Sequence, residues 1–215
     1  MSQTTGLFLT IEGTEGVGKS TAVKFIQDVL QKAGQPTVFT REPGGTPIAE
    51  SLRQILLMPN KAEVIVPDVE LLLMFASRAQ HIAHLIRPAL ERGDWVLSDR
   101  FVDASYAYQG GGRQLDLAKI ETLDRWVVQD LKPTLTFLLD APVEVGMKRA
   151  KHRGPQDRIE QEKKDFFERV RAMYLQRARG EPERFRIIDA TKPLAEVHRQ
   201  IKSILENLLQ EKSRV

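Results

Sequence analysis

The segment from Gly13 to Ser20, with the sequence GTEGVGKS, constrains this chain more than any other feature. It follows the apolar stretch 7–11 and precedes residues 20–30, where apolar side chains recur every three or four positions. A glycine loop between a strand and a helix predicts backbone N–H groups that surround a phosphate. We expect Lys19 to reach the β- and γ-phosphates of a nucleoside triphosphate, and the Ser20 hydroxyl to ligate Mg²⁺.

The loop and the start of the following helix supply the predicted nucleotide-binding residues. A chance match in a glycine-rich turn is the alternative, with a probability on the order of one per cent in a chain of this length. The flanking strand and helix argue against chance. The predicted residues are Gly13, Thr14, Glu15, Gly16, Val17, Gly18, Lys19, Ser20 and Thr21.

Length and composition predict one domain with a sizeable core, because the chain has 215 residues of which 41% are hydrophobic. The absence of cysteine excludes disulfides and thiolate metal sites. No stretch approaches the length of a membrane span, and residues 1–6 lack a basic-then-apolar signal, so we expect a cytoplasmic protein without a membrane partner. A net charge of +3 suits small anions and nucleic acid equally.

Strand-like and helix-like segments alternate along the chain. Apolar segments at 7–11, 36–40, 95–98, 134–139 and 185–188 have the character of strands. Helical patterns occupy 20–30, the residues after Pro47, 68–93 with Asp68 as cap, 116–131, the residues from Glu160, and those after Pro193. This alternation predicts an α/β fold, a doubly wound five-stranded parallel sheet flanked by helices, over residues 1–215. The apolar stripe of the last helix is expected to be core, although it could face a partner.

Polar motifs stand where strands end, which is where such sheets bind ligands. Asp99 ends a strand and is predicted to assist Mg²⁺, with a helix-capping role as the alternative. The guanidinium of Arg100 suits a second phosphate-bearing ligand. The segment 40–46, TREPGGT, predicts either a specific tight loop beside the nucleotide or a plain turn, and 106–113, YAYQGGGR, either base and sugar recognition or a flexible linker.

The segment 148–158, KRAKHRGPQDR, is the most basic part of the chain. A run of cations is usually a solvated surface or a nucleic-acid patch. Its place after the fourth strand also suits a mobile lid, about residues 148–160, that brings cations to a migrating phosphoryl group. We expect the lid.

Four motifs in this order, EGxEGxGKS, TREPGGT, SDRF and AYQGGGR, resemble bacterial thymidylate kinase over about residues 7–209. The resemblance implies transfer of the γ-phosphoryl group of ATP to dTMP, with Mg²⁺, usually by a homodimer. It implies that Glu15 accepts the 3′-hydroxyl of dTMP and that Arg78 donates to the thymine O4. The catalytic residues it implies are Lys19, Asp99 and the lid arginines Arg149 and Arg153.

The same resemblance assigns the rest of the acceptor site. Family members often stack a phenylalanine, four residues before the base-reading arginine, on thymine; that position here is Met74, so either Phe75 or Met74 contacts the base. Tyr108 would crowd the 2′ position. The remaining acceptor residues are Arg100, Arg53 and Arg41 at the phosphate, Pro43 in the TREPGGT loop, and Ser105 and Gln109 at the base.

Two other functions compete with this interpretation. A GTP-dependent switch would carry [NT]-K-x-D late in the chain, but residues 191–194, TKPL, lack the carboxylate. A nucleic-acid motor would need a second domain, so we expect no nucleic-acid partner. A kinase for another nucleoside monophosphate remains the alternative within the same class.

Overall fold

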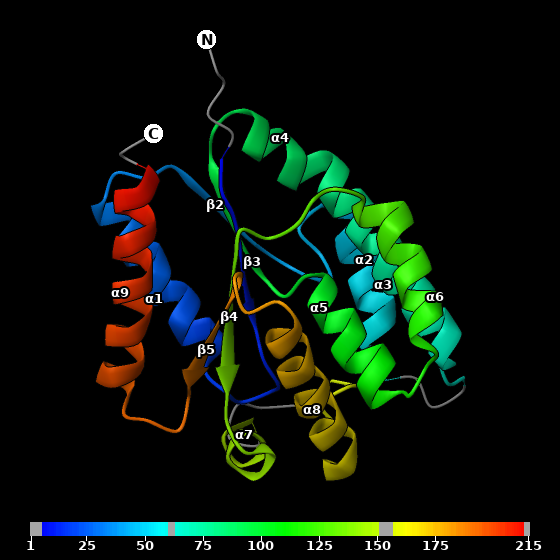
Figure 1. Ribbon diagram of the computed structural model, residues 1–215. Coiled ribbons are helices and arrows are strands. Elements are labelled where there is room, and N and C mark those ends of the chain that lie inside the picture. Colours follow the sequence, from blue (N-terminus) through cyan, green and yellow to red (C-terminus); the bar gives the residue numbers. More distant parts are fainter. Residues whose placement is uncertain (1–5, 60–62, 151–156, 213–215) are drawn as a thin grey trace.

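A computed structural model describes residues 6–59, 63–150 and 157–212. Its centre is a five-stranded sheet in the order β2-β3-β1-β4-β5, with every neighbouring pair parallel (Figure 1). The strands are β1 (Phe8–Glu12), β2 (Thr37–Arg41), β3 (Trp95–Asp99), β4 (Leu135–Asp140) and β5 (Phe185–Asp189). The predicted α/β fold and all five strands are confirmed.

Helices cover both faces of the sheet, so apolar strand residues are buried on either side of it. On one face lie α1 (Lys19–Lys32) and α9 (Leu194–Lys212), side by side (Figure 1). Side chains alternate along each strand, so Leu9 and Ile11 of β1 join the core with α1 and α9, whereas Phe8 joins the opposite core. The stripe of α9 is buried through Val197, Ile201 and Leu205, as expected for core packing.

The remaining helices form the other layer and the end of the molecule that carries the site. They are α2 (Pro47–Leu57), α3 (Pro67–His81), α4 (Arg87–Glu91), α5 (Val102–Ser105), α6 (Leu117–Leu123), α7 (Val143–Ala150) and α8 (Lys164–Gly180). Three π-helical turns, Ile82–Ile86, Tyr106–Gly112 and Asp124–Val128, continue α3, α5 and α6 respectively. No helix in the described ranges is both long and apolar enough to cross a bilayer.

The long helix predicted over 68–93 keeps its path but begins differently. Its N-cap is Val66 without a side-chain cap, and Pro67 takes the first turn, so the prediction that Asp68 caps the helix is wrong. Asp68 lies in the first turn and accepts a hydrogen bond from Lys119 at 2.8 Å. The π turn 82–86 interrupts the helix and leads into α4, whose first turn contains Pro88. The helix expected from Glu160 begins later, at Lys164.

The glycine-rich segment YAYQGGGR is a packed helical segment over residues 106–112, which excludes a flexible linker. Residues 106–112 lie against α8 and are buried apart from Gly111, which is half-buried. A Cβ on Gly112 would lie 2.5 Å from the Phe166 ring and 2.9 Å from Val170 of α8. The glycines therefore permit the close approach of two helices.

We predict that Gly112→Ala lowers the free energy of unfolding by about 1–3 kcal/mol, because the added methyl would overpack the contact with the buried Phe166 ring. Gly180→Ala is the control, because a Cβ there meets nothing within 4 Å. Urea denaturation of both variants is the measurement. Equal stability of the two variants would contradict the packing argument.

Candidate active site

The glycine loop connects β1 to α1 in a conformation that only glycine adopts readily. Gly13, Gly16 and Gly18 have φ values of 137°, 75° and 97°. A Cβ on Gly16 would also lie 1.9 Å from the carbonyl oxygen of Gly146 in α7. The loop is therefore tightly enclosed, with its backbone and the start of α1 available to an anion.

Lys19 is a buried cation at the beginning of α1. Its Nζ donates hydrogen bonds to the carbonyl oxygens of Gly13 at 2.9 Å and Thr14 at 2.8 Å. Burial, and next the charge of Arg100, lower the pKa of Lys19 to about 8. The lowered pKa means that the charged form of Lys19 is disfavoured. An anion bound at the loop would stabilise that form, so Lys19 favours a negatively charged ligand.

Two oxygen donors beside the loop fit Mg²⁺. Asp99 ends β3 next to β1, and its Oδ1 is buried with no hydrogen-bond partner among the described residues. Ser20 presents a hydroxyl on the exposed start of α1, as does Thr21. Mg²⁺ is usually held by one or two protein oxygens together with water and phosphate, and an unpaired buried carboxylate oxygen suits that role. Within the described ranges no cluster of three His or acidic side chains forms an alternative metal site.

The turn after β3 aims Arg100 toward the glycine loop. Arg100 has φ 71°, a left-handed conformation that is costly for a residue other than glycine. The turn is held by the hydrogen bond from Arg100 N to Ile11 O at 2.9 Å and by that from Phe101 N to Glu12 Oε1 at 2.7 Å. Arg100 then donates to Glu15 Oε1 at 2.8 Å and to the Tyr108 hydroxyl at 3.0 Å.

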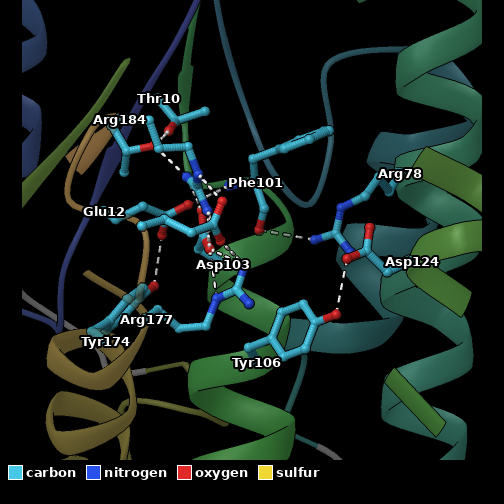
Figure 2. Close-up of polar contacts among 12 residues, drawn as sticks. Thr10, Glu12, Arg78, Phe101, Asp103, Tyr106, Asp124, Tyr174, Arg177 and Arg184 are labelled. Atoms are coloured by element: carbon cyan, nitrogen blue, oxygen red, sulfur yellow. Dashed lines mark hydrogen bonds and ion pairs between the residues drawn. The ribbon is translucent and has the colours of Figure 1, made fainter. Parts of the chain in front are cut away.

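A network of buried charges supports this turn (Figure 2). Asp103 is fully buried and accepts hydrogen bonds from Arg177 at 3.0 Å and from Arg184 at 2.8 and 2.9 Å. Glu12 accepts a 2.7 Å hydrogen bond from the Tyr174 hydroxyl. Burial, and next the charge of Asp103, raise the pKa of Glu12 to about 8. Polar residues within the apolar strand 8–12 were the only signal of this network in the sequence, and we did not predict it.

A cavity opens beside the glycine loop and is lined largely by predicted acceptor residues. Glu15 belongs to both the loop and the cavity wall, so the two sites adjoin. Leu57, Ala104, Asp157, Ile159 and Glu42 also line it and were not predicted, although Glu42 belongs to a motif that was. The predicted residues that it brings together are Glu15, Pro43, Arg53, Arg78, Arg100, Ser105, Tyr108 and Gln109.

Two predicted acceptor residues lie outside the cavity wall. Arg41 is half-exposed and pairs with Glu50 at 2.9 Å. Phe75 is buried in the core, where its ring lies under the Arg78 guanidinium at 4.6 Å from the ring centroid. Of the two alternatives left open at the base, the structure places Met74 at the cavity wall.

The end of the cavity near Arg78 is polar and buried. Arg78 donates to Ser105 Oγ at 3.0 Å and to the Phe101 carbonyl oxygen at 3.1 Å. Gln109 donates its amide N–H to Glu70 at 2.8 Å, which leaves its carbonyl oxygen to accept a hydrogen bond. Donors and an acceptor at one buried end suit a planar polar group such as a nucleobase.

Only part of the predicted lid falls within the described residues. Arg149, near the end of α7, donates to the carbonyl oxygen of Ala190 at 3.0 Å. Arg153 and Lys151 lie outside the described residues. Arg158 follows them and is anchored to Leu56 O at 2.9 Å and to Glu70 at 2.7 Å.

The chain is similar to known thymidylate kinases along nearly its whole length. The thymidylate kinase family model matches residues 11–201. A thymidylate kinase of Pseudomonas savastanoi pv. phaseolicola is 52% identical over 96% of this chain and 98% of its own length. One from Pseudomonas fluorescens (strain SBW25) is 54% identical over the same shares. The crystal structure of thymidylate kinase from Ehrlichia chaffeensis, 30% identical, superposes with a TM-score of 0.75 over 94% of this chain and 99% of that one.

The raised pKa of Glu12 predicts a pH-dependent stability. The folded state holds this proton up to about pH 8 and the unfolded state only to its ordinary value of 4.5. Protonated Glu12 therefore contributes fully to the free energy of unfolding below pH 4.5. This contribution is lost as the pH rises through 8, by at most about 1.4 kcal/mol per pH unit. Glu12→Gln stays neutral, so its free energy of unfolding should fall less over this range. Urea denaturation between pH 5 and 9, at steps on the order of one pH unit, measures the difference. The half-exposed Glu206→Gln is the control, and parallel curves for both variants would refute the prediction.

Proposed function

The chain belongs to the thymidylate kinase family and phosphorylates dTMP, and we propose that the cavity beside its glycine loop is where dTMP is held. The observation that carries this proposal is the position of Glu15, a residue of both the glycine loop and the cavity wall. A triphosphate on the loop and a monophosphate in the cavity would thereby meet end to end. Phosphoryl transfer depends mainly on such positioning and on cations around the migrating group.

On the donor side, the glycine loop and the start of α1 bind the phosphates of ATP through backbone N–H groups. Lys19 exchanges its two bonds to loop carbonyls for phosphate oxygens and stabilises the charge that shifts toward the leaving ADP. Mg²⁺, held by Ser20 and Asp99, would neutralise charge on the same phosphates. Loop, lysine and carboxylate thus act on one group of atoms.

On the acceptor side, Arg100 and Arg53 bind the phosphate of dTMP. Both line the cavity, and burial, followed by the nearby charge of Arg41, lowers the pKa of Arg53. A bound phosphate would offset that effect. Arg41 itself pairs with Glu50 and contributes chiefly through its charge.

The sugar of dTMP fits between the phosphate and the base ends of the cavity. The Tyr108 hydroxyl lies 2.8 Å from both carboxylate oxygens of Glu15 and shares its one hydrogen between them, so the carboxylate is fixed where it can accept the 3′-hydroxyl. The Tyr108 ring is buried and closes this wall of the cavity. A rigid ring at this position would exclude the extra 2′-hydroxyl of a ribonucleotide.

The base end distinguishes thymine from cytosine. Arg78 can donate to the thymine O4, whereas cytosine carries a donor, its amino group, at the same position. The carbonyl oxygen of Gln109 is available to a donor on the base, and Met74 offers a polarisable contact to its face. Arg149 and Arg153 remain the proposed cations that reach the migrating phosphoryl group during turnover. The expected compartment of the protein is the cytoplasm.

We predict that the purified protein with ATP and Mg²⁺ phosphorylates dTMP in preference to dUMP, dCMP, AMP and GMP. Lys19→Ala should lower kcat for dTMP by about a hundredfold or more, because stabilisation of the transferring phosphates is lost. Lys24→Ala, an exposed lysine of the same helix, is the matched control and should keep wild-type rates. A coupled ADP-release assay measures all of them. Preference for another monophosphate would redirect the assignment within the kinase class.

An exposed apolar face on the α2–α3–α6 side supports assembly as a homodimer. Leu72 of α3 is 56% exposed and Trp126 of the 124–128 turn is 74% exposed, and together they border one groove. Ile55 and Met58, at the end of α2, are 54% and 63% exposed and line a second groove together with Val69 of α3. Exposed apolar side chains that line grooves are typical of a contact surface, and a second copy of the chain is the partner that the family resemblance implies.

We predict that Trp126→Glu converts the protein from a dimer to the 24.4 kDa monomer, because a carboxylate would be buried at the contact. Sedimentation velocity at micromolar concentration measures the change. Leu194→Glu is the control, since Leu194 is similarly exposed at 55% but belongs to α9 on the other face of the sheet. A wild-type monomer, or an unchanged Trp126→Glu dimer, would overturn this interface.

A further inference from the structure

We propose that Glu42 and His81 are positioning residues that set base specificity by fixing the orientation of Arg78. The proposal rests on the proposed role of Arg78 as the base-reading side chain. It assigns a function to two buried groups that donor binding and phosphoryl transfer do not use.

Arg78 is constrained on its edges and on its faces. Its Nε, Nη1 and Nη2 donate to Glu42, Ser105 and the Phe101 carbonyl respectively, at 2.8, 3.0 and 3.1 Å. The rings of Phe75 and Phe101 lie 4.6 and 5.5 Å from the guanidinium carbon. One N–H on each terminal nitrogen is then left for a ligand, because a guanidinium has five donors and three are used.

Glu42 contacts Arg78 at Nε and not at its two terminal nitrogens. Its Oε2 accepts from Arg78 Nε, and its Oε1 lies 3.0 Å from His81 Nδ1. Glu42 is 4% exposed and Arg78 is 2% exposed, so neither charge is solvated and each depends on its partner. The position of the Glu42 carboxylate therefore determines the plane and tilt of the guanidinium.

His81 in turn fixes the carboxylate of Glu42. A carboxylate oxygen accepts, so His81 Nδ1 donates to Glu42, and His81 Nε2 lies 2.7 Å from the Thr40 hydroxyl oxygen. Thr40 belongs to β2, where it pairs with Ser98 of β3. A continuous line of contacts thus leads from the sheet through the imidazole and the carboxylate to the base-reading arginine.

The TREPGGT loop closes tightly over the imidazole. A Cβ on Gly45 would lie 2.5 Å from His81 Nε2, so this glycine permits the contact. Gly44 N also donates to Ser77 Oγ of α3 at 3.2 Å. The loop therefore binds α3 on the helix turn that carries Arg78, which gives the motif a role in base selection beyond its nearness to phosphate.

Amide substitutions at His81 separate positioning from plain packing, because each amide replaces one ring nitrogen. The amide of His81→Asn occupies the place of Nδ1 and can still donate to Glu42, whereas that of His81→Gln occupies the place of Nε2 and reaches Thr40 instead. We expect His81→Gln to lower the ratio of kcat/KM for dTMP over dCMP about tenfold or more, since a misplacement of about 1 Å can cost about a hundredfold. His81→Asn should keep most of the wild-type ratio.

The kinetic pattern is as informative as the ratio. Lost orientation at the base should raise KM for dTMP and leave KM for ATP and the kcat at saturation nearly unchanged. Thr10→Val is the control for loss of a buried hydrogen bond elsewhere in the sheet. It removes the hydroxyl that pairs with Thr136 at 2.8 Å and should keep the wild-type ratio of kcat/KM for dTMP over dCMP. Melting temperatures of all variants show whether they fold.

Two results would overturn the proposal. In one, His81→Gln and His81→Asn keep the wild-type ratio; in the other, both lower rates with dTMP and dCMP in the same proportion. Arg78→Ala, measured in parallel, keeps this failure distinct from failure of the proposed function. If Arg78→Ala loses the preference for dTMP while the His81 variants retain it, only positioning fails; if Arg78→Ala retains the preference, the base-reading role itself is wrong.

Discussion

One hydrogen bond, from the backbone N–H of Phe101 to the buried carboxyl group of Glu12, joins the two strand ends on which the site is built. Glu12 is the last residue of β1, directly before the glycine loop, and Phe101 closes the strained turn at Arg100. The phosphate loop and the Asp99–Arg100 pair are consequently held in one rigid unit. The cost is a carboxyl group buried next to Asp103, which is why its pKa is raised.

Each cavity arginine that we propose for the acceptor site already has a partner within the protein. Arg100 pairs with Glu15 at 2.8 Å and Arg78 with Glu42 at 2.8 Å, while Arg53 donates to the Pro43 carbonyl at 2.9 Å. Such pairing keeps the side chains extended toward the cavity and lowers the entropy lost when a ligand binds. A phosphate or base must then compete for donors that are oriented in advance, which favours selectivity over raw affinity.

The fold was predictable, and so was the gathering of most predicted acceptor residues around one cavity, because both depend on local patterns. Apolar strand segments and the glycine loop have short-range signatures, and motifs at strand ends converge in any parallel sheet. Pairings between distant residues have no such signature, so the contacts of Asp103 with Arg177 and Arg184 and the line from Thr40 to Arg78 were not predicted. Residues 106–112 read as loop because glycine disfavours helix, yet packing against α8 makes them helical.

The π-helical turn at 106–112 means that the length of this segment, and not only its composition, encodes the site. It lets Tyr106 reach Asp124 at 2.9 Å and Tyr108 reach Glu15 while Gly112 still meets α8. Removing one residue would restore a regular α-helix and rotate everything beyond the deletion by about 100°. A single-codon deletion here would therefore disturb the cavity wall at Tyr108 and the contact with α8 together.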